Sequence, residues 1–145
     1  MKTKQAILGK IRNFNRYYTK LLGLLDNHLL DSKYSLAEAR ILYEIHDAGK
    51  ITASEIMCEM NIDKGYLSKI LKDFEQTGLI SKHPFEKDRR VTLLSLTNLG
   101  KATFDKLNAV SNQQVESLIS RLDKDDQKKL TIHMQAIIDL LSPRI

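Results

Sequence analysis

The chain has 145 residues, enough for one domain with its own hydrophobic core. Apolar residues make up 42% of it and charged residues 28%, and six Gly and two Pro are too few for the tight turns of a β-sandwich or barrel. The net charge of +5 suits a polyanionic partner, the single cysteine excludes a disulfide framework or a Cys-based zinc site, and no apolar run is long enough to span a membrane.

The N-terminal stretch predicts a long amphipathic helix over residues 5–30, because apolar residues recur there every three or four positions. These positions are Ile7, Ile11, Phe14, Tyr18, Leu21, Leu22, Leu25 and Leu29. Six basic residues precede the first acidic residue, Asp26, and they are Lys2, Lys4, Lys10, Arg12, Arg16 and Lys20.

A second helix is expected over residues 36–48. Ser35 and Glu38 have the spacing of a capping box, in which each side chain accepts a hydrogen bond from the other residue's backbone N–H, and Gly49 ends the helix. Ile51 and Thr52 then form a short extended link, and either Thr52 or Ser54 caps the next helix.

Residues 51–78 predict two helices joined by a tight turn, and the fold is organised around them. Asp63 caps the second helix of this pair, and Gly78 ends it with a left-handed residue. Its apolar stripe comprises Leu67, Ile70, Leu71 and Phe74, and its opposite face carries Lys64, Tyr66, Ser68, Lys69 and Lys72.

This polar face has side chains that bind phosphates and reach base edges, gathered near the start of the helix. A helix-turn-helix presents its recognition helix to the major groove in this way. Gly65 would let the DNA backbone approach closely, and the ring of Tyr66 alternatively packs on the preceding helix. The alternative for the whole pair is an αα-hairpin with a solvated polar face.

After Gly78 the apolar period shortens to two, which predicts strands over residues 79–83 and 91–96. Residues 84–90 form a polar tip between them. A two-stranded ribbon directly after a recognition helix is typical of the wing of a winged helix, and its arginines would suit the minor groove. Together the predicted DNA contacts are Ser54, Lys64, Gly65, Tyr66, Ser68, Lys69, Lys72, Lys87, Asp88, Arg89 and Arg90.

Two further helices are predicted, over residues 98–122 behind a Thr97 cap and from Asp123 to about residue 141. The terminal helices carry more apolar surface than one winged helix-turn-helix can cover, so we expect a two-fold homodimer on a pseudo-palindromic DNA site. The alternative is that these helices pack only on each other within one chain.

The expected fold is therefore mainly α with a small β-hairpin wing, a winged helix-turn-helix with long N- and C-terminal dimerisation helices. It would form a single domain, residues 1–145. Residues 5–30 and 98–143 would provide the dimerisation helices, and residues 35–97 the DNA-binding part.

This order of elements resembles the MarR family of bacterial transcriptional regulators over nearly the whole chain. Asp88, Arg90, Leu96 and Thr97 match the family's wing signature Asp-x-Arg-x5-Leu-Thr. The resemblance implies that Arg90 contacts DNA and that Asp88 orients the basic tip. It also implies a homodimeric repressor that releases DNA when a small, frequently aromatic, ligand binds between the dimerisation and DNA-binding parts.

A narrower resemblance is to MarR-type domains fused to a C-terminal GNAT acetyltransferase. It rests on the segments Phe14-Asn15-Arg16-Tyr17-Tyr18, Ser35-Leu36-Ala37-Glu38-Ala39-Arg40 and Asp63-Lys64-Gly65-Tyr66-Leu67-Ser68. No acetyltransferase lies within these 145 residues, so the chain would be a free-standing relative or a fragment.

A pocket for a small aromatic or anionic effector could form between the first two helices, with Arg16 pairing a carboxylate. Its lining would be Arg16, Tyr17, Tyr18, Tyr43 and His46. The alternative is core packing, with Arg16 in an ion pair with Glu38 or Glu44. Cys58 is expected to be a buried, inert thiol.

No catalytic constellation, cofactor motif or metal-ligand spacing is present, which predicts a protein that is not an enzyme and has no metal or cofactor. With no apolar signal-peptide region behind its first lysines, the chain is expected in the cytoplasm.

The leading hypothesis is a sequence-specific regulator that binds double-stranded DNA. A protein-interaction module that has lost DNA binding, or the N-terminal part of an acetyltransferase, are the alternatives.

Overall fold

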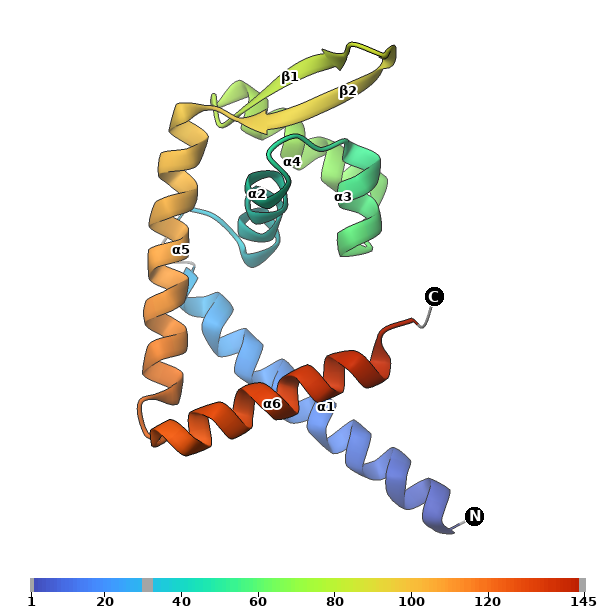
Figure 1. Cartoon of the computed structure of the whole chain (residues 1–145), viewed down its shortest axis with the longest axis vertical. Helices are drawn as coiled ribbons and strands as arrows, with labels where there is room; N and C mark the ends of the chain where they lie inside the picture. The colour runs from blue at the N-terminus through green and yellow to red at the C-terminus, as the bar shows by residue number, and fades with distance from the viewer. Residues whose placement is uncertain (1, 30–32, 144–145) are drawn as a thin grey trace. The chain divides into compact units, whose positions relative to one another are not determined.

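The computed structural model describes residues 2–29 and 33–143 and divides the chain into two compact units, residues 1–110 and 111–145. Its architecture is mainly helical with one β-hairpin, as predicted (Figure 1). The elements are α1 (Lys2–Leu29), α2 (Leu36–Ala48), α3 (Ala53–Met60), α4 (Lys64–Gln76), β1 (Ile80–Phe85), β2 (Asp88–Leu96), α5 (Asn98–Ile119) and α6 (Lys124–Leu141).

The starts of α2 and α3 are fixed by two capping boxes. The Ser35 hydroxyl accepts a hydrogen bond from the Glu38 backbone N–H at 3.2 Å, and the Glu38 carboxylate accepts one from the Ser35 N–H at 3.2 Å. Thr52 plays the same part with Glu55, so Thr52 and not Ser54 is the cap of α3. Each box satisfies two backbone donors that a helix end leaves without an intrahelical partner.

The two ends of α4 follow the prediction. The Asp63 carboxylate accepts a hydrogen bond from the Tyr66 N–H at 3.0 Å. Gly78 has a φ of 79°, and the Leu79 N–H reaches back to the Phe74 carbonyl at 2.8 Å. This is a Schellman ending, in which a left-handed glycine turns the chain out of the helix while the last carbonyls stay paired.

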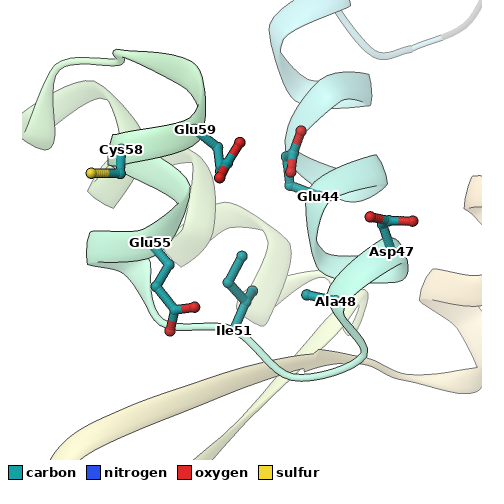
Figure 2. Close-up of a pocket in the computed structure, with 7 residues that line it drawn as sticks. All are labelled: Glu44, Asp47, Ala48, Ile51, Glu55, Cys58 and Glu59. Carbon is teal, nitrogen blue, oxygen red and sulfur yellow. The ribbon is translucent and has the colours of Figure 1, made fainter. Parts of the chain in front are cut away.

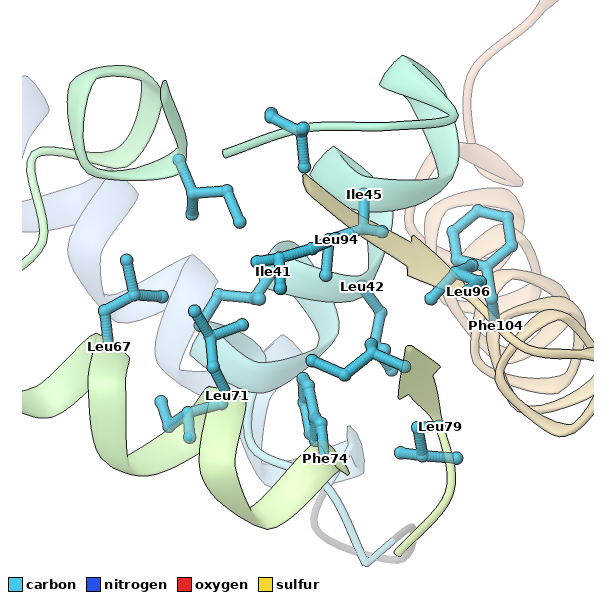
Figure 3. Close-up of a cluster of buried hydrophobic side chains, with 14 of the residues drawn as sticks. Ile41, Leu42, Ile45, Leu67, Leu71, Phe74, Leu79, Leu94, Leu96 and Phe104 are labelled. Atoms are coloured by element: carbon cyan, nitrogen blue, oxygen red, sulfur yellow. The ribbon is translucent and has the colours of Figure 1, made fainter. Parts of the chain in front are cut away.

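The core of the first unit lies where α2, α4 and the hairpin meet (Figure 3). All four residues of the predicted α4 stripe are at most 5% exposed, which confirms that this face packs inward. The buried apolar residues are Ile41, Leu42, Ile45, Ile51, Ile56, Leu67, Ile70, Leu71, Phe74, Leu79, Ile80, Leu94, Leu96, Phe104 and Leu107.

The hairpin is longer than predicted. Its strands continue through most of the segment expected as a loop, so that Glu86 and Lys87 alone form the turn. The expectation failed because charged side chains were interpreted as a sign of a loop, whereas strand pairing is made by the backbone. The structure also pairs Ile51 with Leu94 through two backbone hydrogen bonds of 3.0 and 2.7 Å, which anchors the α2–α3 link to the wing.

A compact joint connects the end of α4 to the start of α5. The Thr97 hydroxyl donates to the Gly78 carbonyl and accepts from the Gly100 N–H at 3.0 Å, which caps α5 as predicted. The Thr97 N–H donates to the Leu79 carbonyl at 3.0 Å. A Cβ on Gly100 would lie 2.0 Å from that same carbonyl oxygen, so the backbones approach more closely here than any side chain allows.

In the second unit α5 ends at Ile119, three residues before the predicted end. The Gln127 side-chain amide donates to the Ile119 and Leu122 carbonyls at 3.3 and 3.1 Å, and so caps the C-terminal end of α5. Asp123 caps α6 as expected, accepting from the Asp126 N–H at 2.8 Å.

The terminal helices expose much of their apolar surface in a single chain. Ile7, Ile11 and Phe14 of α1 are 53%, 52% and 45% exposed, and no residue of α6 is buried. The side chains of Leu25 and Leu29, which complete the predicted α1 stripe, lie outside the described side chains. Large exposed apolar faces of this kind mark surfaces that a partner covers.

Candidate nucleic-acid interface

The polar face of α4 is open to solvent. Lys64, Ser68, Lys69 and Lys72 are exposed on the side away from the core. Tyr66 is 48% exposed, so part of its ring is open to solvent, and the alternative that the ring packs on α3 stays a prediction. The face therefore offers three ammonium groups, a hydroxyl and a phenol to a ligand approaching α4.

The structure gives a reason for glycine at position 65 that the sequence did not reveal. A Cβ at this position would lie 3.2 Å from the Asp63 carboxylate oxygen, which is the oxygen that caps α4. A Cβ here would require the carboxylate to shift by a few tenths of an ångström, so glycine leaves the cap undisturbed.

The tip of the wing holds one arginine in place with an acid. Asp88 accepts hydrogen bonds from the Arg90 backbone N–H and from Nε of its guanidinium, both at 3.1 Å. The side chain of Arg90 nevertheless remains 91% exposed. These hydrogen bonds, the side-chain one foremost, lower the pKa of Asp88 from its ordinary value of 3.8, so the pair is charged at neutral pH.

A bulge in β2 determines where the arginines lie. Pro84 pairs with Thr92 but Phe85 pairs with Asp88, so residues 89–91 lie on one strand between two successive pairs of the other. Bulges bend a strand and redirect its side chains. Arg89 and Arg90 are both exposed on this bulge, beside the turn that carries Lys87.

Lys82 ties the wing to α4. Its Nζ lies 2.8 Å from a carboxylate oxygen of Glu75, and the two side chains are 46% and 47% exposed. Lys82 is a basic residue of the wing, but its charge is paired here. The pairing escaped sequence analysis because the chain reverses direction between the two residues.

The wing also carries a small polar network on one of its faces. The Ser81 and Ser95 hydroxyls lie 3.2 Å apart across the strands, and Nε2 of His83 is 3.0 Å from each. These cross-strand contacts hold the two strands in register near the base of the wing.

The residues predicted for an effector pocket fall into separate groups. His46 stacks on Phe104 at 4.0 Å between ring centroids, and Tyr43 lies 6.4 Å from the same ring. On α1, Tyr18 stacks on Phe14 at 5.7 Å, while Arg16 and Tyr17 are exposed. A pocket that joins these groups stays a prediction.

The alternative role of Arg16, an ion pair with Glu38 or Glu44, is not the pairing that the structure gives these two acids. The Glu44 carboxylate accepts a hydrogen bond from Nε of Arg40 at 2.8 Å, and the Glu38 carboxylate belongs to the α2 capping box. The i,i+4 spacing of Arg40 and Glu44 on one helix favours that pair over one with another helix.

A recess of about 340 Å³ lies between α2 and α3 and is acidic (Figure 2). Cys58 lies at this recess and is exposed, so the expectation of a buried thiol was wrong. Its neighbour Ile56 is the buried residue of α3, and a position two residues further along a helix faces the other way. The recess is lined by Glu44, Asp47, Ala48, Ile51, Glu55, Cys58 and Glu59.

Within residues 2–29 and 33–143, no group of three or more His, Cys, Asp or Glu side chains is placed to hold a metal ion. In the same part of the chain, no helix is long and apolar enough to cross a membrane.

Comparison with known proteins identifies the family. The family model "MarR family" matches residues 34–92, which contain α2, α3, α4 and most of the wing. Residues 34–92 therefore match the MarR family of transcriptional regulators. The resemblance inferred from the wing signature is thereby confirmed.

Two proteins similar to this chain are bacterial regulators. The HTH-type transcriptional regulator BilQ of Clostridium symbiosum is 27% identical over 100 residues, which cover 67% of this chain and 69% of BilQ. The HTH-type transcriptional regulator MgrA of Staphylococcus aureus is 26% identical over 121 residues, which cover 82% of this chain and 76% of MgrA.

Solved MarR structures share the fold. A mutant of MarR from E. coli in complex with operator DNA matches with a TM-score of 0.74 at 23% identity, covering 91% of this chain and 95% of that one. BpsR of Bordetella bronchiseptica, whose DNA binding is regulated by 6-hydroxynicotinic acid, matches with a TM-score of 0.72 at 19% identity, covering 88% and 91%. The predicted winged helix-turn-helix fold is therefore confirmed.

Proposed function

We propose that this MarR-family regulator binds double-stranded DNA as a homodimer and represses transcription. The polar face of α4 enters the major groove, and the tip of the wing reaches the adjacent minor groove. The proposed DNA contacts are Ser54, Lys64, Gly65, Tyr66, Ser68, Lys69, Lys72, Lys87, Asp88, Arg89 and Arg90.

The observation that carries this proposal is the geometry of the Asp88–Arg90 pair. The Asp88 carboxylate accepts two hydrogen bonds from the Arg90 guanidinium, at 3.1 and 3.4 Å, and one from the Arg90 backbone N–H at 3.1 Å, yet 91% of the Arg90 side chain stays exposed. An arginine held in position but open to solvent has little rotamer entropy left to lose on binding, and narrow minor grooves attract arginine through their negative potential.

A second copy of the chain is the proposed cover for the exposed apolar faces of α1 and α6. Two-fold symmetry would place two recognition helices on two half-sites of a pseudo-palindromic operator, about 34 Å apart. Each half-site would then receive one α4 and one wing.

A small aromatic or anionic effector is proposed to control DNA binding. The support comes from BpsR, whose DNA binding is regulated by 6-hydroxynicotinic acid, and from the aromatic residues Tyr43, His46 and Phe104 on this chain. The proposed site would add Arg16, Tyr17 and Tyr18.

Because its relatives are regulators, we propose that the protein is not an enzyme and needs no cofactor. The bacterial cytoplasm, where chromosomal DNA lies, is the proposed compartment. The narrower resemblance to domains fused to acetyltransferases stays a prediction.

The test is a mobility-shift titration on the DNA upstream of the protein's own gene, repeated across a salt series. Arg90→Ala should weaken binding about 10- to 100-fold and reduce the slope of log K against log salt by about 0.9, because one phosphate or groove contact is lost.

Arg121→Ala removes an exposed arginine from the second unit and is the matched control, which should leave affinity unchanged. Equal affinity of the Arg90 variant and the wild type would remove the wing from the interface. Absence of any salt-dependent DNA binding by the wild type would reject the function itself.

A further inference from the structure

The positive charge of the protein is concentrated on α1. Its first 22 residues carry six Lys and Arg and no Asp or Glu. The charge of this segment therefore exceeds the net charge of +5 of the whole chain. The remaining residues therefore have a net charge of −1. The predicted DNA-binding part, residues 35–97, holds nine Lys and Arg against ten Asp and Glu, so it too has a net charge of −1.

This distribution matters for binding a polyanion. Attraction between exposed charges falls off over about 8 to 10 Å at physiological ionic strength, so local surfaces count more than the total. The winged helix-turn-helix has basic groups at α4 and the wing tip, but it carries acidic groups elsewhere that offset them. The first 22 residues of α1, by contrast, carry cations with no acid among them.

The cations of α1 form a face of their own. Arg12, Arg16 and Lys20 follow each other at four-residue spacing, which aligns them along one side over about 12 Å. Arg16 comes nine residues after Ile7, or about 2.5 helical turns, so it points away from the apolar stripe. All three basic side chains are exposed.

The position of this face distinguishes a membrane surface from an anionic partner that binds the basic face alone. A helix that lies in a bilayer surface buries its apolar stripe in the lipid, and cations directly opposite that stripe point into water. Arg12, Arg16 and Lys20 are opposite the stripe and would be directed away from the lipid phosphates. A partner that binds the basic face alone leaves the apolar stripe available to a second copy of the chain.

We propose that the basic face of α1, formed by Arg12, Arg16 and Lys20, binds the phosphates of double-stranded DNA without reading its sequence. This inference rests on the proposed function, since it takes the same polymer as partner, but it adds a second surface separate from α4 and the wing. Phosphate contacts of this type supply salt-dependent, non-specific affinity.

The experiment uses fluorescence anisotropy with a 40-base-pair duplex of random sequence across a sodium chloride series. Arg12→Gln/Arg16→Gln/Lys20→Gln should reduce the slope of log K against log salt by about 2.7 for each α1 engaged, at about 0.9 for each phosphate contact. Arg12→Lys/Arg16→Lys should keep the wild-type slope, because phosphates recognise the charge.

The matched control is Lys124→Gln/Lys128→Gln/Lys129→Gln, which removes the same charge from exposed positions of α6 and should leave the slope unchanged. Far-UV circular dichroism and sedimentation of all variants verify that α1 remains helical and the oligomeric state remains that of the wild type.

Three outcomes would overturn the inference. One is an α1 triple variant with the wild-type slope on the random duplex. Another is an equal loss of slope in the α6 control, since net charge would then explain the effect. A third is wild-type binding to phosphatidylglycerol vesicles that the α1 variant loses while its DNA slope is unchanged. Wild-type binding to the upstream DNA in the first and third cases would leave the proposed function standing.

Discussion

At the scale of single residues, the Asp88–Arg90 pair sets the shape of the wing tip. Because hydrogen bonds to Arg90 lower the Asp88 pKa below 3.8, their contribution is fully present above the unfolded-state pKa. It is lost only as the pH falls through the lowered folded-state pKa. The wing tip should therefore be insensitive to pH near neutrality.

Asp88→Asn tests this pair. The substitution removes the acceptor charge that holds the guanidinium, so the ratio of affinities for upstream and random DNA should fall roughly two- to five-fold, as expected for an exposed ion pair. Affinity for random DNA should not fall, because a negative charge has been removed. Glu86→Gln makes the same charge change within the turn and serves as control. An unchanged ratio in the Asp88 variant would contradict the orienting role.

Residues whose partners are close in sequence were the ones that sequence analysis placed correctly. The caps Ser35, Asp63 and Asp123 act within three residues, so their partners can be predicted from spacing alone. The Lys82–Glu75 pair was missed because it depends on how the chain reverses after α4. Burial of Cys58 was predicted wrongly because its sequence neighbours are apolar, although its helical spacing from Ile56 predicts exposure.

At the scale of elements, the joint between α4 and α5 depends on a glycine. Gly100→Ala should lower the free energy of unfolding by about 1 to 3 kcal/mol, because a Cβ 2.0 Å from the Leu79 carbonyl oxygen forces the backbones apart. Gly9→Ala in α1 is the control, since a Cβ there meets nothing within 4 Å, and it should raise stability by about 0.5 to 1 kcal/mol.

Urea denaturation of the glycine variants at one protein concentration gives both values. Equal stability of Gly100→Ala and the wild type would show that the joint can relax.

Helices were predicted more accurately than strands for a physical reason. The apolar period, the caps and the terminal glycines are local signals, and they located α2 with its observed ends. The strands and the bridge from Ile51 to Leu94 depend on backbone pairing between segments distant in sequence, which side-chain patterns report only in part.

At the scale of the whole molecule, the exposed apolar face of α6 predicts how the proposed dimer can be broken. Ile138→Glu should shift the protein to monomers and weaken operator binding, because a carboxylate would have to be desolvated at the interface. Analytical ultracentrifugation measures the first effect and anisotropy the second. Lys129→Glu places the same charge on the opposite side of α6 and should leave a dimer; a dimeric Ile138 variant would move the interface elsewhere.

Sequence reasoning identified which faces of the terminal helices are apolar but not what covers them. Periodicity fixes the direction of a face relative to its own helix axis, whereas a partner is a property of a complementary surface. The exposure of Ile7, Phe14 and Ile138 supports the same prediction without naming the neighbour.

The acidic recess between α2 and α3 has a consequence for how DNA approaches. Asp47, Glu55 and Glu59 line it beside the paired Glu44, and their carboxylates repel phosphates. In the proposed binding mode, a duplex over this side of the helix-turn-helix would be repelled, while one near α4 and Arg90 would be attracted. The negative charge of the recess would therefore orient the molecule so that α4 and the wing face the DNA before any base is contacted.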